Sequence, residues 1–470
     1  MTREPGARRR DVLVGVGGVV AWAASGCGGS GGDGTDPSEG RNAWPDAPWE
    51  GLGPADGAAF PLGVQSGDPA ADGVVLWTRY VGVEGLEVVV VAFDGEAWRE
   101  VTTLDAPVED GGYVHVVLDG MDSDVSLGFQ FRDGSGATSA VGTCRTAIAP
   151  DSALPVVIGA TSCLNMVRGD FPALVRAVER GPMDAFVQVG DTVYADGSET
   201  AEEYRAVWAE VLSTSGLSTL ARTVSQVHTW DDHEVDNNWN SEGAPEELVA
   251  IARAAFFEST PMRRDADHPD RIYRVLHFGQ TADVFVLDCR GERDEATGTY
   301  ISDEQLAWLL DGIAGSQATW KLIINSVPVT DMPLAYEVSD VVVDRWDGFP
   351  EQRAALLDGI AATGAAGVLF VSGDFHHPGL YRVDAEGTHA NLWEALTGPG
   401  GSSLNPLGVL IEDGEQFFWS DAVYCATRFE LYPDGRARIV VVGEDDETWF
   451  DGLLTADGRV LAAAIEHSQP

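Results

Sequence analysis

Basic residues are scarce in this chain. It carries 29 Lys and Arg against 75 Asp and Glu, which gives a net charge of −46 at pH 7 and a pI near 4.2. A surface of this charge would repel nucleic-acid phosphates rather than neutralise them, so stable nucleic-acid binding is not expected. The ordinary interpretation is a solvated acidic surface that keeps an exported protein soluble.

Cysteine is also rare. Five cysteines in 470 residues are too few for a disulfide-rich scaffold. If Cys27 is modified and Cys163 binds a metal, as argued below, then Cys144, Cys289 and Cys425 remain and at most one disulfide can form. The sequence does not choose the pair. Cys144 and Cys425 are favoured only because Cys289 lies inside an apolar strand-like run.

The N-terminal region has no apolar run long enough to cross a bilayer as a stable helix. Three arginines, 8–10, precede Asp11 and an apolar stretch that ends at Ala24. RRDVL resembles a twin-arginine export signal, and ASGC resembles a lipoprotein cleavage box with Cys27 as the lipid-modified residue. We therefore expect residues 1–27 to be a signal peptide, with an ordinary signal peptide or a disordered start as the alternative.

The segment that follows Cys27 has the composition of a tether. GGSGGDGTDPSEG is rich in Gly, Ser and Asp, which predicts a flexible linker over residues 28–58. These features together predict export by the twin-arginine machinery. The mature protein is expected as a lipid-anchored monomer on the periplasmic or extracellular face of the membrane.

The remaining chain divides into two regions by pattern. Residues 59–150 contain short alternating or apolar runs separated by Gly and Asp turns, which predicts a small all-β sandwich of the immunoglobulin or fibronectin kind. From residue 151 apolar strands alternate with helical stretches, which predicts an α/β catalytic region over 151–470. The runs 422–432 and 436–444 are expected to form a closing hairpin as the last strands.

Residue types that bind metals follow four apolar strand-like runs. The residues are Cys163 after VVIGAT, Asp191 and Tyr194 after AFVQV, Asp231, Asp232 and His233 after VSQVHTW, and Asp374 and His376 after GVLFVSG. Ligands bind outside the carboxyl ends of parallel strands, so these side chains are expected at one edge of a sheet. Carboxylate, imidazole, thiolate and phenolate together indicate a polynuclear metal site that performs hydrolysis.

Each of these residues also has a structural interpretation. Asp191 suits a carboxylate that bridges two cations, but an Asp after a strand is often a turn or helix cap. Tyr194 and Cys163 are common packing residues. WDDHEVDNNW is the sharpest local signal, because no amphipathic element explains so many polar side chains. In LDCRGER, Arg290 or Arg293 could bind a phosphate or form a surface ion pair.

The ordered set of motifs resembles the PhoD-type alkaline phosphatases, a branch of the metallophosphoesterase superfamily. The similarity runs from about Phe60 to the C-terminus through FPLGVQSGDPAADGVVLWTR, SC, GDTVYAD, WDDHEVDNNW, LDCRGER, WDGFPEQR and SGDFHH. This resemblance implies an αββα catalytic sandwich after a small all-β domain. It also implies Fe3+ with Ca2+, twin-arginine export, and hydrolysis of phosphate mono- or diesters through attack by a metal-bound hydroxide or oxide.

The resemblance also implies roles for single residues. The iron ligands would be Cys163, Asp191, Tyr194 and His376. The calcium ligands would be Asp191, Asp232 and Asp374, with Asn237 as a further ligand. His233 and Arg290 would contact the substrate phosphate. Two alternatives remain from the residues themselves. One is a non-enzymatic calcium-binding surface lipoprotein, and the other is a hydrolase that uses Cys163 as its nucleophile.

Overall fold

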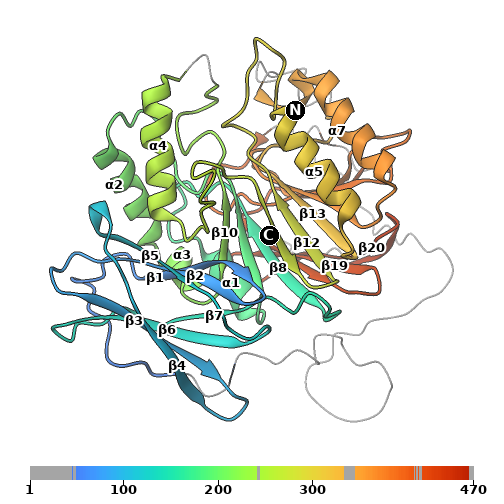
Figure 1. Cartoon of the computed structure of the whole chain (residues 1–470). Helices are drawn as coiled ribbons and strands as arrows, with labels where there is room; N and C mark the ends of the chain where they lie inside the picture. The colour runs from blue at the N-terminus through green and yellow to red at the C-terminus, as the bar shows by residue number, and fades with distance from the viewer. Residues whose placement is uncertain are drawn as a thin grey trace, which may run out of the picture.

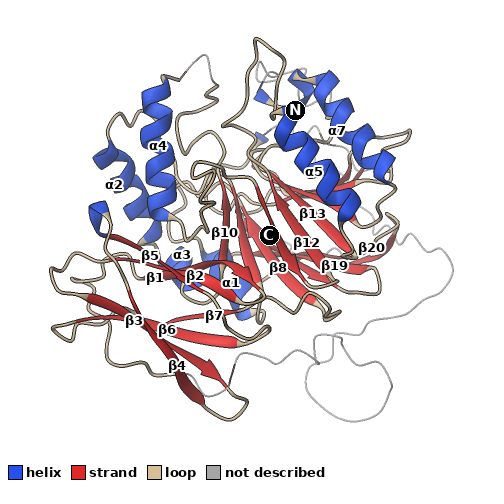
Figure 2. Ribbon diagram, viewed as in Figure 1, coloured by secondary structure: helices blue, strands red, loops and turns tan. Residues whose placement is uncertain are grey.

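The computed structural model describes residues 45, 49–240, 244–332, 344–406, 408, 411 and 415–464. Two β-sheets lie face to face, and helices cover their outer faces (Figures 1 and 2). This arrangement confirms the predicted α/β class and the αββα sandwich. Residues 1–27 of the predicted signal lie outside the described part of the chain. Within that part, no helix is long and apolar enough to cross a membrane.

The first sheet has ten strands and carries half of the site. Three parallel strands form its centre, β8 (Val156–Thr161), β9 (Ala185–Val189) and β10 (Gln226–Thr229). On one side they continue into the antiparallel strands β18 (Cys425–Leu431), β19 (Arg436–Gly443), β20 (Thr448–Thr455) and β21 (Val460–Ala464). On the other side lie β1 (Val64–Ala70), β2 (Gly73–Arg79) and β5 (Tyr113–Leu118).

The second sheet has seven strands. Its parallel centre consists of β12 (Ala282–Val286), β13 (Trp320–Asn325), β14 (Val368–Ser372) and β16 (Trp393–Leu396). The antiparallel strands β11 (Arg274–Phe278), β15 (Gly379–Arg382) and β17 (Phe417–Ser420) complete its edges. The parallel strands of each sheet share one direction, so their carboxyl ends gather at one edge.

Successive side chains of a strand point to opposite faces of its sheet, so each sheet packs against the other sheet on one face and against helices on the other. In β13, Leu322 and Ile324 enter the core between the two sheets, whereas Ile323 faces the helices outside. Helices α5 (Asp303–Gly315) and α7 (Pro350–Thr363) cover this second sheet. Helices α1 (Pro172–Glu179), α2 (Ala201–Leu212), α3 (Ser215–Ala221) and α4 (Glu246–Ser259) cover the first sheet. The alternation of these helices with strands after residue 151 is the one that the sequence predicts.

The N-terminal β-region is a sandwich that shares a sheet with the catalytic region. Its outer sheet contains β3 (Leu86–Phe93), β4 (Trp98–Asp105), β6 (Ser126–Asp133) and β7 (Gly142–Arg145). This sheet packs against β1, β2 and β5, which belong to the ten-stranded sheet. The junction is the parallel pairing of Gly67 with Gln226, where a Cβ on Gly67 would lie 2.7 Å from the Gln226 carbonyl oxygen. The ten-stranded sheet therefore runs across the expected boundary at residue 150.

The structure corrects three further expectations. Residues 49–58, assigned above to the flexible linker, are bound to the β-region, since Leu52 N–H donates to Gln130 at 2.6 Å and Asp56 N–H to the Thr138 carbonyl at 2.8 Å. The hairpin of β18 and β19 is not last, because β20 and β21 follow it. The four described cysteines, Cys144, Cys163, Cys289 and Cys425, are all free and buried, so the single disulfide that the sequence allowed does not form among them.

Candidate metal centre

The residues that follow the central strands adopt a backbone conformation that few side chains favour. The φ angles are positive at four of them: 59° at Cys163, 53° at Asp191, 58° at Asp374 and 54° at His376. These left-handed conformations cost energy in non-glycine residues and concentrate at functional sites. At each position the chain turns sharply just after leaving its strand, and the side chain is held at the edge of the sheet.

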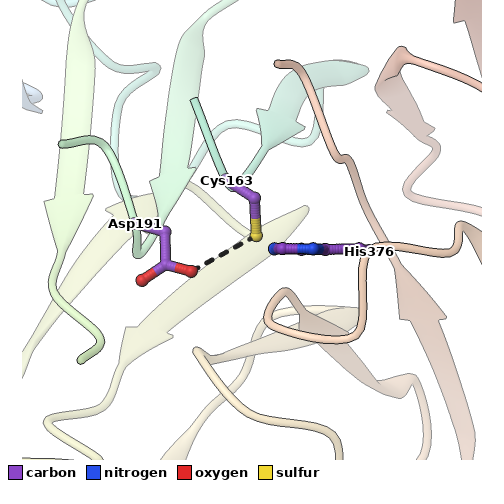
Figure 3. A group of neighbouring side chains, drawn as sticks. All are labelled: Cys163, Asp191 and His376. Atoms are coloured by element: carbon purple, nitrogen blue, oxygen red, sulfur yellow. Dashed lines mark hydrogen bonds between the residues drawn. The ribbon is translucent and has the colours of Figure 1, made fainter. Parts of the chain in front are cut away.

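One group of donors gathers around a single oxygen of Asp191. The Cys163 Sγ and the Tyr194 hydroxyl each lie 3.5 Å from Asp191 Oδ2, and the Tyr194 hydroxyl lies 3.2 Å from His376 Nε2. Figure 3 shows that Cys163 lies between Asp191 and His376. The ligand atoms of Cys163, Asp191 and His376 all lie within 4.8 Å of one another, which is close enough to share one ion.

A second group meets the other side of Asp191. Asp191, Asp232 and His233 also offer ligand atoms within 4.8 Å of one another. The His233 backbone N–H donates to Asp191 Oδ1 at 3.3 Å, and the Asn238 N–H donates to Asp232 Oδ2 at 2.6 Å. Asp191 belongs to both groups, which is the position that a bridging carboxylate requires.

The His233 ring is fixed from two directions. Its Nδ1 lies 2.8 Å from Asp196 Oδ1, and its ring packs against the Tyr194 ring at a tilt of 30°, with the ring centroids 4.0 Å apart. Burial lowers the pKa of His233, but the hydrogen bond with Asp196 and the nearby Asp232 outweigh it and raise the pKa above the ordinary value. Nδ1 is bound to Asp196, which leaves Nε2 for other partners.

Buried negative charges dominate the electrostatics. Burial, followed by Asp232 and Asp231, holds the pKa of Asp191 well above its ordinary range. Burial and then Asp191 raise the pKa values of both Cys163 and Tyr194. Buried like charges are costly unless they are paired or bind a metal. The donor set therefore fits bound cations, which would restore the charged forms of these groups.

Two further residues predicted as metal ligands, His376 and Asp374, differ in their pKa shifts. Burial lowers the pKa of His376 to about 4, so its imidazole is neutral at physiological pH, as a metal ligand must be. Burial raises the pKa of Asp374 to about 7, against the opposing effect of Arg345. Arg345 reaches Asp374 Oδ2 with Nε at 3.0 Å and with Nη2 at 2.9 Å.

Arg290 was predicted to contact the substrate phosphate, but the structure surrounds its side chain with carboxylates. Its side chain is 0% exposed, and its Nε lies 2.7 Å from Asp231 Oδ1. The other edge of the guanidinium binds Asp344, with Nη2 at 3.0 Å from Oδ2. Asp232 is 3.7 Å away, and Arg290 with His233 lowers the Asp232 pKa to about 2 despite burial. Arg290 therefore stabilises the buried carboxylates Asp231 and Asp344, and this geometry does not support a direct contact with substrate.

Asn237 is not part of either group of metal-type donors around Asp191. It is exposed, and its backbone N–H donates to Asp196 Oδ1 at 2.7 Å. Asn237 helps to fix the loop that carries His233, but its position does not support the predicted role as a calcium ligand. Its neighbour Asn238 contributes through the backbone contact with Asp232.

Several functional residues were not selected from the sequence. The buried Glu234 accepts backbone N–H groups from Asp191 at 3.1 Å, Thr192 at 2.6 Å and Asp231 at 2.9 Å. Burial raises its pKa to about 7. Its position in the polar run WDDHEVDNNW was the available signal. Such partners orient the ligands of a metal and tune its affinity.

The loop after β16 also reaches the ligands. The N–H groups of Gly401 and Ser402 donate to the Cys163 carbonyl at 3.0 and 2.9 Å, and the Ser402 side chain is hydrogen-bonded to Tyr194. Gly398 allows the approach, because its φ is 79° and a Cβ there would lie 2.6 Å from Ser162 Oγ. The GPGGSS sequence that follows an apolar strand was the signal for this loop.

Comparison with known proteins identifies the family. Residues 157–409 match the PhoD-like phosphatase family, and residues 50–148 match the N-terminal domain of PhoD-like phosphatases. The chain belongs to the PhoD-like phosphatase family. It is 27% identical to alkaline phosphatase D of Bacillus subtilis (strain 168), over 72% of this chain and 68% of that protein. As a PhoD-like phosphatase it is a hydrolase of phosphoric esters, which confirms the resemblance seen in the sequence.

Solved structures agree on the fold. The structure of PhoD superimposes with a TM-score of 0.73 at 22% identity, covering 86% of this chain and 92% of that one. A purple acid phosphatase, PPD1 from yellow lupin seeds, gives a TM-score of 0.58 at 14% identity and covers 85% of this chain and 73% of that one. The PhoD-like chain therefore has the sandwich architecture of these phosphatases.

Proposed function

We propose that this PhoD-like chain is an exported, metal-dependent alkaline phosphatase and phosphodiesterase. The observation that carries the proposal is the position of Asp191, which belongs to both of the adjacent groups of metal-type donors. Membership of the phosphatase family supplies the reaction class, and the donor chemistry supplies the metal dependence. The alternative of a calcium-binding lipoprotein without activity is not favoured by that membership.

The donors divide by chemical softness. One set of donors consists of a thiolate, a carboxylate, a phenolate and an imidazole, which together suit Fe3+. These groups belong to Cys163, Asp191, Tyr194 and His376, respectively. Asp191, Asp232 and Asp374 offer oxygen alone, which suits Ca2+. Cations held there would lower the pKa of a shared water and polarise the oxygens of the phosphate.

His233 is the side chain best placed to act on the substrate. Asp196 holds Nδ1, which fixes the ring orientation and leaves Nε2 for a phosphate oxygen or the leaving group. A protonated Nε2 would stabilise charge on that oxygen and could donate the proton as the ester bond breaks. Arg290 and Glu234 would keep the ligand-bearing loops in place.

Cys163 is less suited to nucleophilic attack. Burial and the charge of Asp191 raise its thiol pKa, which opposes formation of a free thiolate. The thiolate is the reactive form, and a bound cation is the partner that would stabilise it here. This observation supports a ligand role over the nucleophile alternative.

Export and anchoring belong to the same proposal. The arginines at 8–10, the apolar run to Ala24 and the ASGC sequence support twin-arginine export and lipid attachment at Cys27. Twin-arginine export moves folded proteins, so a metal centre could be loaded before translocation. Radiolabelled palmitate uptake by the wild type, and its loss in Cys27→Ser, would test the anchor.

Hydrolysis of p-nitrophenyl phosphate and its bis-ester tests the function. The chain from residue 28 would be assayed at alkaline pH alone, with a chelator, and with calcium restored. Activity that the chelator removes and calcium recovers supports the proposal, and Asp191→Asn should abolish both turnover and metal binding. A folded, metal-replete protein without turnover on either ester would refute it.

A further inference from the structure

The loop that follows Cys163 exposes two neighbouring apolar side chains. Met166 is 36% exposed and Val167 is 74% exposed, and among the large hydrophobic residues that the structure describes only Val83 is more exposed than Val167. A single exposed apolar side chain is common on protein surfaces. Here, however, two adjacent ones lie three and four positions after a proposed metal ligand.

The two residues occupy the middle of a tight turn. The Arg168 N–H donates to the Asn165 carbonyl at 3.4 Å, and the Val167 N–H donates to Asn165 Oδ1 at 2.9 Å. Met166 and Val167 are therefore the two central residues of the turn, positions where Gly, Pro, Asn, Asp and Ser are usual. The turn does not require apolar side chains, and their exposed surface adds little to the stability of the fold.

The turn is fixed at both ends. Before it, the Leu164 N–H donates to the Asp191 carbonyl at 2.8 Å, which ties the turn to the proposed bridging ligand. After it, Arg168 Nη2 lies 2.6 Å from Glu444 Oε2, and the guanidinium lies over the Tyr424 ring, 4.8 Å from the centroid. The charge of Arg168 is thus matched by a carboxylate, and the apolar residues are held in place beside the centre.

The loop after β16 lies beside the turn and shares its lack of carboxylates. The Gly401 N–H donates to the Cys163 carbonyl at 3.0 Å, and a Cβ on Gly401 would lie 2.7 Å from the Asn165 carbonyl oxygen. The sequence has no acidic residue over 152–169 or over 395–411, although 75 of its 470 residues are Asp or Glu. The two loops therefore give this side of the centre a border without negative charge.

We propose that Met166 and Val167 form a subsite for the alcohol part of the substrate and favour phosphate esters of apolar alcohols. This inference rests on the proposed function and adds a substrate class to it. Four residues span at most about 14 Å, so the turn is within reach of an alkyl or aryl group whose phosphate is bound at the centre. Such a group would remove the apolar side chains from water, which favours binding.

The test compares the binding of hexylphosphonate and methylphosphonate, two esterase-resistant anions that differ in apolar length. Calorimetry on the full-length, metal-loaded protein gives both affinities independently of turnover. The variants are Val167→Ser, Val167→Leu and the double variant of Val167→Ser with Met166→Gln. Val83→Ser is the matched control, because it changes an exposed valine in the loop between β2 and β3. Elemental analysis of each protein gives the metal content.

Wild type should bind hexylphosphonate at least about 10-fold more tightly than methylphosphonate, because the longer chain covers the two side chains. This preference should fall roughly 3- to 10-fold in Val167→Ser and further in the double variant. Val167→Leu should retain or increase it, since the apolar surface is kept. Val83→Ser should match wild type. The ratio of kcat/KM for hexyl phosphate and methyl phosphate should follow the same order, with unchanged metal content.

Three results would overturn the inference. Equal binding of the two phosphonates by wild type would exclude an apolar subsite. An unchanged preference in the double variant would place the apolar contact elsewhere in the protein. Equal losses for both phosphonates would show that the turn acts on the phosphate or on the metal ligands instead. Wild type that neither binds methylphosphonate nor hydrolyses an ester would refute the proposed function itself, whereas equal phosphonate binding with normal turnover would refute the apolar subsite alone.

Discussion

Glu234 accepts the backbone N–H of Asp191 at 3.1 Å, so a side chain from the loop after β10 fixes the backbone of the loop after β9. The same carboxylate binds the N–H groups of Thr192 and Asp231. One buried side chain thus sets the relative positions of two strand ends that carry metal-type donors. This relationship leads to the first prediction.

Glu234→Gln should destabilise the protein by about 1–3 kcal/mol, because an amide donor would face backbone donors and leave a buried group unsatisfied. Metal affinity should fall roughly 10- to 100-fold, since the ligand-bearing backbone loses its support. Urea unfolding and metal titration measure the two effects. Glu202→Gln on the exposed face of α2 is the control. If both variants behave alike, Glu234 does not organise the site.

Asp196→Asn should impair protonation of the leaving group. An Asn cannot match the charge that Asp196 offers to His233 Nδ1, so the ring loses its favoured proton arrangement. We expect kcat to fall about 100-fold or more for an alkyl phosphate and much less for p-nitrophenyl phosphate, whose leaving group needs little help. Asp236→Asn changes an exposed carboxylate in the same loop and should preserve both rates. Equal losses for the two substrates would argue against this role for His233.

Tyr194 should give the purified protein a colour. If Tyr194 and Cys163 bind Fe3+, charge transfer from phenolate and thiolate produces visible absorption. Tyr194→Phe should remove the phenolate contribution and shift or weaken the band, whereas Tyr204→Phe, in helix α2, should leave it unchanged. Visible spectroscopy on matched concentrations makes the comparison. A colourless wild type with full activity would exclude the iron assignment but not the phosphatase function.

His277 should give a small pH dependence to stability away from the site. The hydrogen bond between His277 Nδ1 and Asp283, at 2.7 Å, raises the folded-state pKa of His277 above its ordinary value despite partial burial. The stabilising contribution is complete below the unfolded-state pKa and is lost as pH rises through the higher folded-state pKa. Because His277 is largely exposed, the contribution should be at most about 1 kcal/mol.

Thermal unfolding of wild type and His277→Asn between pH 5.5 and 8.5 measures this effect. The difference between the two proteins should be largest at the acidic end and should shrink toward pH 8.5. A difference that grows with pH would show that the assigned direction of the pKa shift is wrong.

Reducing agents should not alter the stability of the protein. Cys144, Cys163, Cys289 and Cys425 are free and buried, and burial raises their thiol pKa values. In the chain from residue 28, a thiol reagent should label all four only after denaturation and metal removal. Fewer than four reactive thiols under those conditions would reveal a disulfide and contradict the structure.

The sequence predicted the parts of the site that lie directly on strand ends. An apolar run followed by a polar residue identifies such a position without knowledge of its neighbours in the fold. Cys163, Asp191 and Asp232 were predicted in this way and lie in the two donor groups, whereas Asp374, predicted in the same way, lies in neither group. The helices were also predictable, because their apolar periodicity is local. The extension of the first sheet to β1 was not, since Gly67 and Gln226 are far apart in sequence.

The roles that depend on tertiary neighbours were less predictable. Arg290 looked like a phosphate ligand until Asp231 and Asp344 were seen to enclose its guanidinium. Asn237 has the right chemistry, but the loop turns it outward. Glu234 lies in the polar run WDDHEVDNNW and Ser402 in GPGGSS, but these local patterns do not predict the hydrogen bonds that the two residues make with other loops.

The position of β8 constrains how the centre is assembled during synthesis. Its neighbours are β9 and β18, and the hydrogen bond from the Thr161 hydroxyl to the Cys425 carbonyl spans 264 residues of sequence. While the ribosome is still translating, the strand that leads to Cys163 has an open edge on the side that β18 later covers. Such an edge pairs readily with other chains. Nascent chains that stop before β18 should therefore aggregate, and the catalytic centre should mature only near the end of translation.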